Sequence, residues 1–300
     1  MSLRILEPGP LALVEDLGRP GRADIGVSPS GALDRSALRL ANRLVGNAEG
    51  FAAVELLLGG FAARFETPAW FAVTGAMAPL TLDGAPIDGN RAVHADAGAT
   101  LRIGAPTAGI RSYLAVRGGL DVPPVLGSRS TDVLSGLGPA PLRAGDTVAL
   151  GPEPPEPVGL VDFVAVDAPA GGVVTVRAHL GPRADWFTPA AVDAFFGHEW
   201  ELSADSNRVG SRLDPVRERA HLAGFEPRTG PLLERAVTGE LPSEPMVAGA
   251  VQVSPDGRPT VLLADHPVTG GYPVIAVVAD ASRDLFAQLR PGQRLTFRHA

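Results

Sequence analysis

The chain has 300 residues, of which 45% are hydrophobic and 20% charged, and its formal net charge is -7. This composition is typical of folded globular proteins, and the length suits two domains or one large β-rich domain. The longest apolar runs, such as residues 56–63 and 274–279, are far shorter than the ~18 residues of a membrane-spanning helix. We therefore predict no membrane segment. Because the first residues also lack a signal-peptide pattern, we predict a cytoplasmic protein.

Two residue types are missing from the chain. There is no cysteine, which excludes thiolate nucleophiles, disulfides and zinc–thiolate sites. There is also no lysine, since all 26 basic residues are arginine. This excludes Schiff-base chemistry, the lysine of a P-loop and biotin attached covalently to this chain. No basic run stands out, so we predict no nucleic-acid binding and expect a small molecule or another protein as partner.

Glycine and proline divide the apolar pattern into short strand-like runs. The chain contains 36 glycines and 29 prolines, which excludes long helical bundles and favours a mainly β fold. The predicted strands include, in chain order, residues 11–14, 71–74, 112–116, 173–177, 260–263 and 273–278. A glycine turn followed by an alternating strand recurs at residues 97–103, 144–150 and 291–297. Such units suit barrel-like lobes.

Three helices are predicted among these strands. The strongest covers residues 30–46, where apolar side chains share one face after a capping Ser30. A second covers residues 188–197, beginning with a Thr-Pro pair that is typical of helix starts. A third opens at Ser282 and stops before a Pro-Gly pair. The mainly β prediction therefore includes only a few helices.

The domain boundary is predicted from proline content. Four prolines fall between residues 151 and 159, which is typical of a semi-rigid extended linker. We therefore predict an N-terminal β-rich lobe over residues 1–150, a linker over 151–159 and a C-terminal β-rich lobe over 160–300.

Common catalytic motifs are absent from the sequence. It contains no G-x-G-x-x-G, Walker loop, G-x-S-x-G elbow or H-E-x-x-H, and its six histidines lack metal-ligand spacing. We therefore predict no metal site. Four loops are instead rich in residues that bind anions, and they cover residues 16–34, 127–132, 203–213 and 263–273.

The first two loops each allow two interpretations. The loop at 16–34 fits a turn and a helix cap about as well as a ligand site. The loop at 127–132 contains Ser128, Arg129, Ser130 and Thr131, whose hydroxyls and guanidinium could cradle a phosphate or carboxylate. The alternative for the second loop is an Arg–Asp bridge within the loop itself.

The last two loops carry candidate charged groups. Arg208 and Arg212 stand four residues apart and suit an anion clamp, although surface arginines commonly only face solvent. Asp265 and His266 follow an apolar strand and precede a Gly-Gly turn and Tyr272. A lone histidine is more often structural, but the adjoining carboxylate favours an acid–base pair here.

The same loops carry a resemblance to a known family. The chain resembles, over nearly its whole length, the biotin-dependent carboxyltransferase-like family, which includes the C subunit of 5-oxoprolinase, allophanate hydrolase subunit 2 and the antagonist of a sporulation-kinase inhibitor. The blocks that carry the resemblance are Leu17-Gly18-Arg19, Gly31-Ala32-Leu33-Asp34, Ala41-Asn42-Arg43-Leu44-Val45-Gly46-Asn47, Thr74-Gly75-Ala76, Tyr113-Leu114-Ala115-Val116-Arg117-Gly118-Gly119, Gly127-Ser128-Arg129-Ser130-Thr131, Gly249-Ala250-Val251-Gln252-Val253 and Thr269-Gly270-Gly271-Tyr272-Pro273.

The resemblance implies two cyclophilin-like β-barrel lobes. It also implies a partner similar to the B subunit of 5-oxoprolinase, which is like allophanate hydrolase subunit 1 and is called here the B-like protein. The implied activity is an ATP-dependent hydrolase whose A, B and C subunits together open the lactam of 5-oxoproline, with ATP bound at the complex.

Two alternatives to this hydrolase stay open. One is a carboxyltransferase subunit of the urea carboxylase and allophanate pathway type, which takes carboxyl-biotin from a separate carrier. The other is a non-catalytic regulator that binds the B-like protein. A lysine-free chain that stands alone looks more like the hydrolase subunit.

Side-chain chemistry at the matching positions suggests roles. Asp265 and His266 are the expected catalytic pair, and the expected substrate-binding residues are Ser128, Arg129, Ser130, Thr131, Arg208, Arg212, Gln252, Thr269, Gly270, Gly271 and Tyr272. Within this set Gln252 and Tyr272 are expected to orient an amide. The sequence departs from the family pattern at residues 138–141, at His266-Pro267-Val268 in place of Arg-Gln-Thr, and at Asn207 in place of Asp.

Overall fold

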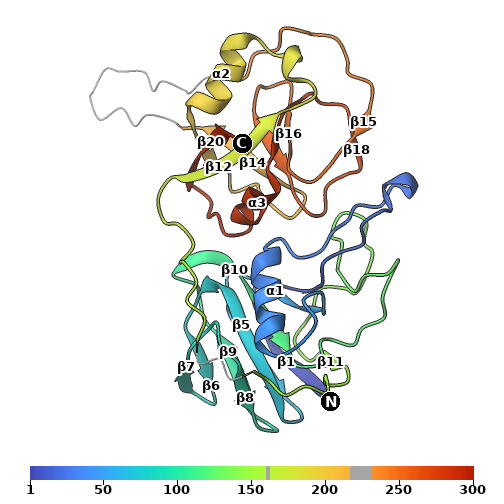
Figure 1. Cartoon of the computed structure of the whole chain (residues 1–300), viewed down its shortest axis with the longest axis vertical. Helices are drawn as coiled ribbons and strands as arrows, with labels where there is room; N and C mark the ends of the chain where they lie inside the picture. Colours follow the sequence, from blue (N-terminus) through green and yellow to red (C-terminus); the bar gives the residue numbers. More distant parts are fainter. Residues whose placement is uncertain (160–162, 217–231) are drawn as a thin grey trace. The chain divides into compact units, whose positions relative to one another are not determined.

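The computed structural model describes residues 1–159, 163–216 and 232–300 (Figure 1). The chain forms two compact units. Unit 1 comprises Met1–Arg22 and Pro29–Pro169, and unit 2 comprises Ala23–Ser28 and Ala170–Ala300. Within the described ranges, no helix has the length and apolar character needed to cross a membrane.

Unit 1 contains two β-sheets whose neighbouring strands are all antiparallel. The six-stranded sheet has the order β11 (Thr147–Ala149), β1 (Ser2–Pro8), β4 (Phe61–Phe65), β9 (Thr100–Ile103), β6 (Leu80–Leu82) and β7 (Ala85–Ile87). The five-stranded sheet has the order β2 (Leu11–Glu15), β3 (Ala53–Leu57), β10 (Ala108–Val116), β5 (Ala69–Met77) and β8 (Val93–Ala95).

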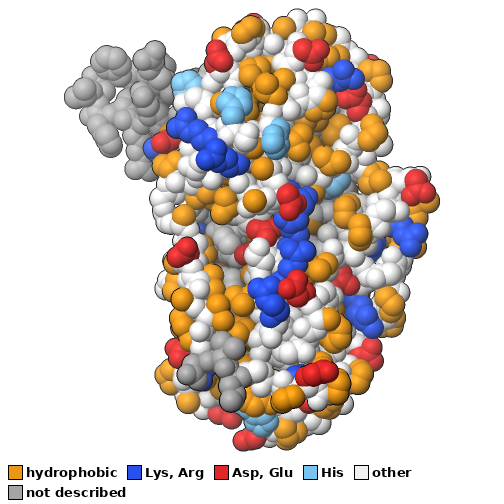
Figure 2. Space-filling model, viewed as in Figure 1, with side chains coloured by type: hydrophobic (Ala, Val, Ile, Leu, Met, Phe, Trp, Pro, Cys, Tyr) orange, Lys and Arg blue, Asp and Glu red, His pale blue; other side chains and the backbone are white. Residues whose placement is uncertain are grey.

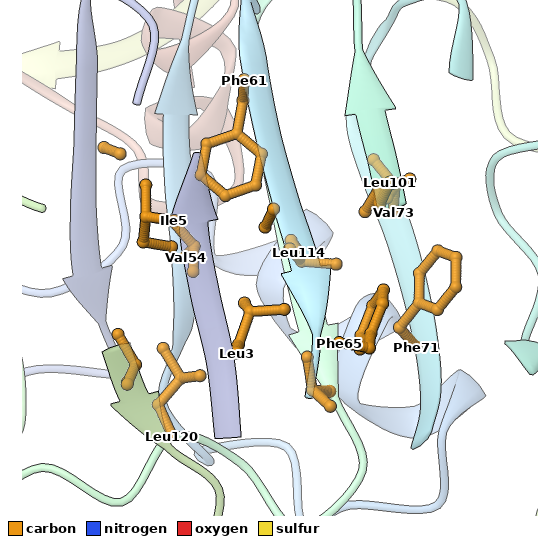
Figure 3. Packing of buried hydrophobic residues seen from close by; sticks show 14 of the residues in the cluster. Leu3, Ile5, Val54, Phe61, Phe65, Phe71, Val73, Leu101, Leu114 and Leu120 are labelled. Carbon is orange, nitrogen blue, oxygen red and sulfur yellow. The ribbon is translucent and has the colours of Figure 1, made fainter. Parts of the chain in front are cut away.

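The main core of unit 1 combines side chains from both sheets (Figure 3). Leu3 and Phe65 from the first sheet and Val54, Phe71 and Leu114 from the second are at most 1% exposed. Phe65 and Phe71 stack with their ring centroids 5.0 Å apart. Side chains alternate between the two faces of a strand, so the second sheet has an opposite face that does not contribute to this core. Another element packs on that face.

That element is α1 (Arg35–Leu44), which packs on β5 and β10. The predicted helix is therefore confirmed, but its predicted start is wrong: Asp34 is the N-cap and accepts a hydrogen bond from the Ala37 amide at 2.9 Å. Ser30 lies at φ 53 outside the helix instead of at its cap. On the face shown in Figure 2, arginine side chains form a column over α1, whose sequence places arginine at positions 35, 39 and 43.

A buried hydrogen-bond network fixes the start of α1 on the sheet. The Tyr113 hydroxyl donates to Glu55 Oε2 at 2.7 Å and accepts from the Asp34 amide at 2.7 Å. The Leu33 amide also donates to Glu55 Oε2, at 3.0 Å. Tyr113 is 0% exposed, and burial together with the Glu55 charge raises its pKa well above 10.0. The phenol therefore stays protonated in the folded chain at pH values that ionise an exposed tyrosine.

We expect this network to give the protein an alkaline instability. The pKa of Tyr113 is higher in the folded chain than in the unfolded chain, where it is about 10. The stability that protonated Tyr113 contributes is therefore fully present below about pH 10 and is lost as the pH rises toward the folded-state pKa. With no lysine or cysteine in the chain, tyrosine is the main group that titrates between about pH 9 and 11. In urea unfolding, Tyr113→Phe should cost about 1–3 kcal/mol at pH 8 and should lose less stability than wild type on going to pH 11. The exposed Tyr272→Phe is the matched control, and an equal pH slope in wild type and Tyr113→Phe would contradict the expectation.

Unit 2 is built on a closed barrel of seven strands. In order around the barrel these are β12 (Val174–Leu180), β19 (Val274–Val278), β16 (Ala250–Val253), β17 (Pro259–Leu262), β14 (Gly210–Pro215), β13 (Glu199–Leu202) and β20 (Arg294–His299). Strands β12 and β20 are parallel and the other neighbours are antiparallel. A separate two-stranded sheet joins β15 (Glu244–Pro245) to β18 (Thr269–Gly270).

Aromatic side chains join the second helix to the barrel. Helix α2 (Pro189–Gly197) is capped by Thr188, as predicted. Its Phe195 stacks on Phe297 of β20 at 4.3 Å, and the Trp200 indole N–H donates to the Phe195 carbonyl at 3.1 Å. The third predicted helix is shorter than expected: α3 (Asp280–Arg283) is followed by a 3-10 turn, η3 (Asp284–Ala287), and Ser282 lies inside α3 instead of opening it. Two further 3-10 turns are η1 (Ala23–Ile25) and η2 (Ala184–Trp186).

The mainly β prediction is confirmed, and so are the six predicted strands, which fall in β2, β5, β10, β12, β17 and β19. The three glycine turns are also confirmed. Gly98, Gly145 and Gly292 have φ between 81 and 93, and each turn closes with a backbone hydrogen bond before β9, β11 or β20. Positive φ at the third turn position requires glycine in a type II turn, which is why this sequence unit recurs.

Residues 151–159, predicted to be a linker, lie in unit 1. Arg117 is 4% exposed and holds this segment: its Nη2 donates to the carbonyls of Pro154 and Glu156, and its Nε pairs with Glu153 at 3.2 Å. Proline gives the segment its extended form, and the Arg117 guanidinium holds the segment against unit 1. The division between the two units along the chain falls at Pro169 and Ala170.

Candidate functional site

The loop around Asp16 interlocks with the segment before α1. The Arg19 amide donates to the Pro29 carbonyl at 2.7 Å, and the Ala32 amide donates to the Asp16 carbonyl at 2.9 Å. Gly18 has φ +85, and a Cβ there would lie 2.4 Å from the Pro29 oxygen. Only glycine allows this approach of the two backbones. The interlock positions the Asp16 and Arg19 side chains.

The Ser128–Thr131 loop surrounds a carboxylate of the chain itself. The hydroxyls of Ser128 and Ser130 donate to Asp16 Oδ1 at 2.5 and 2.6 Å, and the Arg129 amide donates to Oδ2 at 2.6 Å. Asp16 is 8% exposed and both serines are 0% exposed. The loop thus has the anion-binding chemistry that the sequence suggested, with Asp16 as the anion that these groups contact.

The other two residues of this loop have different settings. Thr131 is buried, and its hydroxyl donates to the Pro139 carbonyl at 3.0 Å. The Arg129 side chain is 39% exposed and lies 3.6 Å from Asp121. Neither contact brings these side chains to Asp16, although the Arg129 backbone amide does reach it.

In unit 2 the register of two strands places Arg208 beside Asp265. Strands β14 and β17 pair Gly210 with Leu262. The chains stay side by side beyond the end of this ladder, because the Asp265 amide donates to the Arg208 carbonyl at 3.1 Å. Arg208 Nε and Nη2 then donate to the two Asp265 oxygens at 2.9 and 3.1 Å. The side chains are 2% and 0% exposed, so this is a buried, two-pronged ion pair.

His266 follows this pair directly and is 2% exposed. Its Nδ1 lies 2.8 Å from the Pro267 carbonyl oxygen. A carbonyl only accepts hydrogen bonds, so Nδ1 carries a proton, and in the neutral form of the ring the lone pair is then on Nε2. This tautomer suits a group that accepts a proton at Nε2.

Gln252 and the Gly-Gly turn form the neighbouring part of unit 2. The Gln252 side-chain amide donates to the Tyr272 carbonyl at 3.2 Å. A Cβ on Gly270 would lie 2.4 Å from Gln252 Nε2, so glycine lets the turn approach this amide. The Tyr272 ring is 47% exposed and lies 6.0 Å from the Arg235 guanidinium carbon. The structure therefore brings together the residues that we expected to orient an amide, and adds Arg235.

The remaining predicted ligands lie on more exposed surfaces. Arg212 is exposed on β14, so it does not share the buried setting of Arg208. Thr269 pairs with Pro245 in the small sheet and is exposed, as is Gly271. On the same small sheet Glu244 forms an ion pair with Arg183, and hydrogen bonding to that guanidinium lowers the Glu244 pKa below 4.5.

Sequence reasoning did not select two polar residues that the structure makes central. Asp16 and Arg19 belong to the first of the four loops but were not among the expected ligands. Arg19 is 2% exposed, and its Nη2 and Nε donate to the carbonyls of Ser130 and Val125. The signal available in the sequence was a charged pair flanking Leu17-Gly18 shortly after the apolar run of residues 11–14.

Comparisons with known proteins match the whole fold. The family described as carboxyltransferase domain, subdomain A and B, matches residues 25–299. The chain is 38% identical to the C subunit of 5-oxoprolinase from Escherichia coli over 98% of this chain and 90% of that protein. It is 34% identical to urea amidolyase of Lachancea kluyveri over 99% of this chain, but this covers only 17% of that protein.

A solved structure agrees with these matches. The crystal structure of the K. lactis urea amidolyase superimposes with a TM-score of 0.87 at 30% identity, covering 99% of this chain and 18% of that one. The family match, the sequence relatives and this structure agree with the resemblance noted in the sequence. The chain belongs to the carboxyltransferase domain family, subdomains A and B.

Proposed function

We propose that this protein is the C subunit of a 5-oxoprolinase-type enzyme, which opens the lactam of 5-oxoproline to glutamate with ATP. The observation that carries the proposal is the extent of the match: the chain covers 90% of the E. coli 5-oxoprolinase C subunit but 17% of the L. kluyveri urea amidolyase. The similarity thus extends over nearly all of a separate subunit. The B-like protein and a partner similar to the A subunit, called here the A-like protein, complete the proposed enzyme.

The polar residues of unit 2 suit the handling of an amide-like group. In the proposal His266 exchanges a proton at Nε2, and the Arg208–Asp265 pair holds the turn that carries it. Gln252 and the Thr269–Tyr272 turn orient the lactam, since a side-chain amide and backbone groups match its donor and acceptor. The chain has no lysine, so its arginines and backbone amides are the groups available to ATP phosphates, and we place ATP at the complex.

A second candidate is a carboxyltransferase subunit acting on urea or a related amide. It is favoured by the TM-score of 0.87 to the K. lactis urea amidolyase. In this case the carboxyl group arrives on biotin attached to another protein, because biotin attachment needs a lysine. The two proposals differ in the required carrier and in the substrate.

An assay with purified proteins separates the candidates. The B-like protein and this chain are mixed, with and without the A-like protein, and run on size-exclusion chromatography before ATP consumption is measured. We expect co-elution of this chain with the B-like protein, and ATP consumption that depends on 5-oxoproline. Dependence on urea and on a biotin carrier would support the second candidate. A stable complex without any substrate-dependent ATP consumption would identify a regulatory binder and overturn both.

A further inference from the structure

Arg19 is a buried cation without a paired carboxylate among the described residues. It is one of the largest fully buried side chains, with an exposed fraction of 2%. Its Nε donates to the Val125 carbonyl at 3.3 Å, and its Nη2 donates to the Ser130 carbonyl. Its Nη1 is also buried, and the described part of the chain offers it no hydrogen-bond partner. One nitrogen of a permanent charge is therefore unsatisfied inside unit 1.

Three other buried arginines differ from Arg19 in this respect. Arg111 lies 3.5 Å from Glu55, Arg117 lies 3.2 Å from Glu153, and Arg208 lies 2.9 Å from Asp265. Each of these three guanidinium groups thus has a carboxylate within ion-pair distance. An arginine cannot lose its proton in a protein, so burial without a counter-charge is costly.

Asp16 does not provide this counter-charge. Its two oxygens accept hydrogen bonds from the Gly18 and Arg129 amides and from the hydroxyls of Ser128 and Ser130. Ser130 links the two charged groups, since its hydroxyl contacts Asp16 and its carbonyl contacts Arg19. The carboxylate is already surrounded by donors, whereas the guanidinium keeps one unused edge.

We propose that Arg19 Nη1 binds a small planar oxyanion, a carboxylate or bicarbonate, in unit 1. The guanidinium N–H groups lie in one plane and match the plane of such an anion, and the added charge compensates the buried cation. This site is formed by residues of unit 1 and is additional to the Arg208–Asp265 pair of unit 2. The proposed anion site does not depend on whether the enzyme acts on 5-oxoproline or on urea.

The turn at residues 125–128 is the segment that opens to admit the anion. Val125 and Ser128 pair with each other across it, and the Val125 carbonyl contacts Arg19 Nε. At its tip Leu126 has φ 52, in a region that side chains other than glycine and asparagine disfavour. Opening this turn moves the Val125 carbonyl away from the guanidinium and disturbs the Ser128 hydrogen bond to Asp16, because Ser128 belongs to the turn. The Gly18, Arg129 and Ser130 groups that also donate to Asp16 lie outside residues 125–128.

Thermal unfolding of the full chain tests the site. Sodium acetate and sodium bicarbonate are titrated against sodium chloride at matched ionic strength and pH, with sodium phosphate as a non-planar comparison. In wild type we expect Tm to rise saturably with acetate or bicarbonate, by about 3–6 °C at ten times Kd. The rise should be absent in Arg19→Gln. A response to phosphate alone would overturn the assignment to a planar anion.

Arg117→Gln is the matched control, because Arg117 is similarly buried but its guanidinium nitrogens are all hydrogen-bonded. It should lower Tm yet keep the anion-dependent rise. If Arg19→Gln fails to fold, hydrogen exchange on wild type decides the question: acetate or bicarbonate should slow exchange over residues 125–131 relative to chloride. Equal Tm responses in wild type and Arg19→Gln, or unchanged exchange, would overturn the proposal.

Discussion

Asp265→Asn should lower the free energy of unfolding of unit 2 by about 3–5 kcal/mol, because it removes the charge from one member of a buried ion pair. The carboxylate is 0% exposed and accepts two hydrogen bonds from one guanidinium. Asparagine keeps the shape but supplies one acceptor oxygen and no charge. Arg208→Lys should be costly too, since an ammonium group cannot reproduce the planar two-pronged contact. Calorimetry of the full chain measures both effects.

The matched control is the exposed pair of Asp214 and Arg258. Their side chains are 39% and 51% exposed and their closest atoms are 2.8 Å apart. Asp214→Asn should change stability by less than about 1 kcal/mol, as is usual for surface ion pairs. If Asp265→Asn were as mild as this control, the Arg208–Asp265 pair would not hold the turn as we infer.

His266→Gln should lower the turnover of the assembled enzyme by about a hundredfold or more, which is typical of losing a general acid or base. Glutamine keeps a hydrogen-bond donor for the Pro267 carbonyl but has no group that exchanges protons near neutral pH. We therefore expect Tm and co-elution with the B-like protein to change little. Initial rates of ATP-dependent 5-oxoproline cleavage at saturating substrate give the comparison.

His94 offers the control for His266. It also lies near an aspartate, with Nδ1 3.6 Å from Asp96, but its side chain is 43% exposed. His94→Gln should leave turnover unchanged. A large loss of stability with normal turnover in the folded fraction of His266→Gln would show that His266 only packs the turn.

Local features of the fold could be predicted from the sequence. The glycine turns before β9, β11 and β20 follow from backbone sterics at a single residue, and the cap of α2 follows from a Thr-Pro pair. The predicted start of α1 was wrong for a non-local reason. The interlock of Gly18 with Pro29 sets the path of residues 29–31, so the helix begins only after Asp34.

The pairings within the site could not be predicted in this way. Asp16 meets Ser128 across 112 residues of sequence, and Arg208 meets Asp265 across 57. The Arg208–Asp265 contact depends on the register of β14 and β17, and the Asp16–Ser128 contact depends on the docking of the Ser128–Thr131 loop beside β2, where the Thr131 amide donates to the Val14 carbonyl. Neither is encoded in the local pattern. The sequence therefore indicated the loops that carry polar groups. The structure showed which groups pair, and among the four buried arginines of the described residues only Arg19 has no carboxylate within ion-pair distance.

The most direct test of the central claim is glutamate formation from 5-oxoproline by a mixture of the A-like protein, the B-like protein and this chain with ATP. Initial rates are compared among the complete mixture, the mixture without this chain and the mixture containing His266→Gln. We expect rapid glutamate formation only in the complete wild-type mixture, with about a hundredfold lower rate for the variant. An equal rate of glutamate formation without this chain would contradict this expectation.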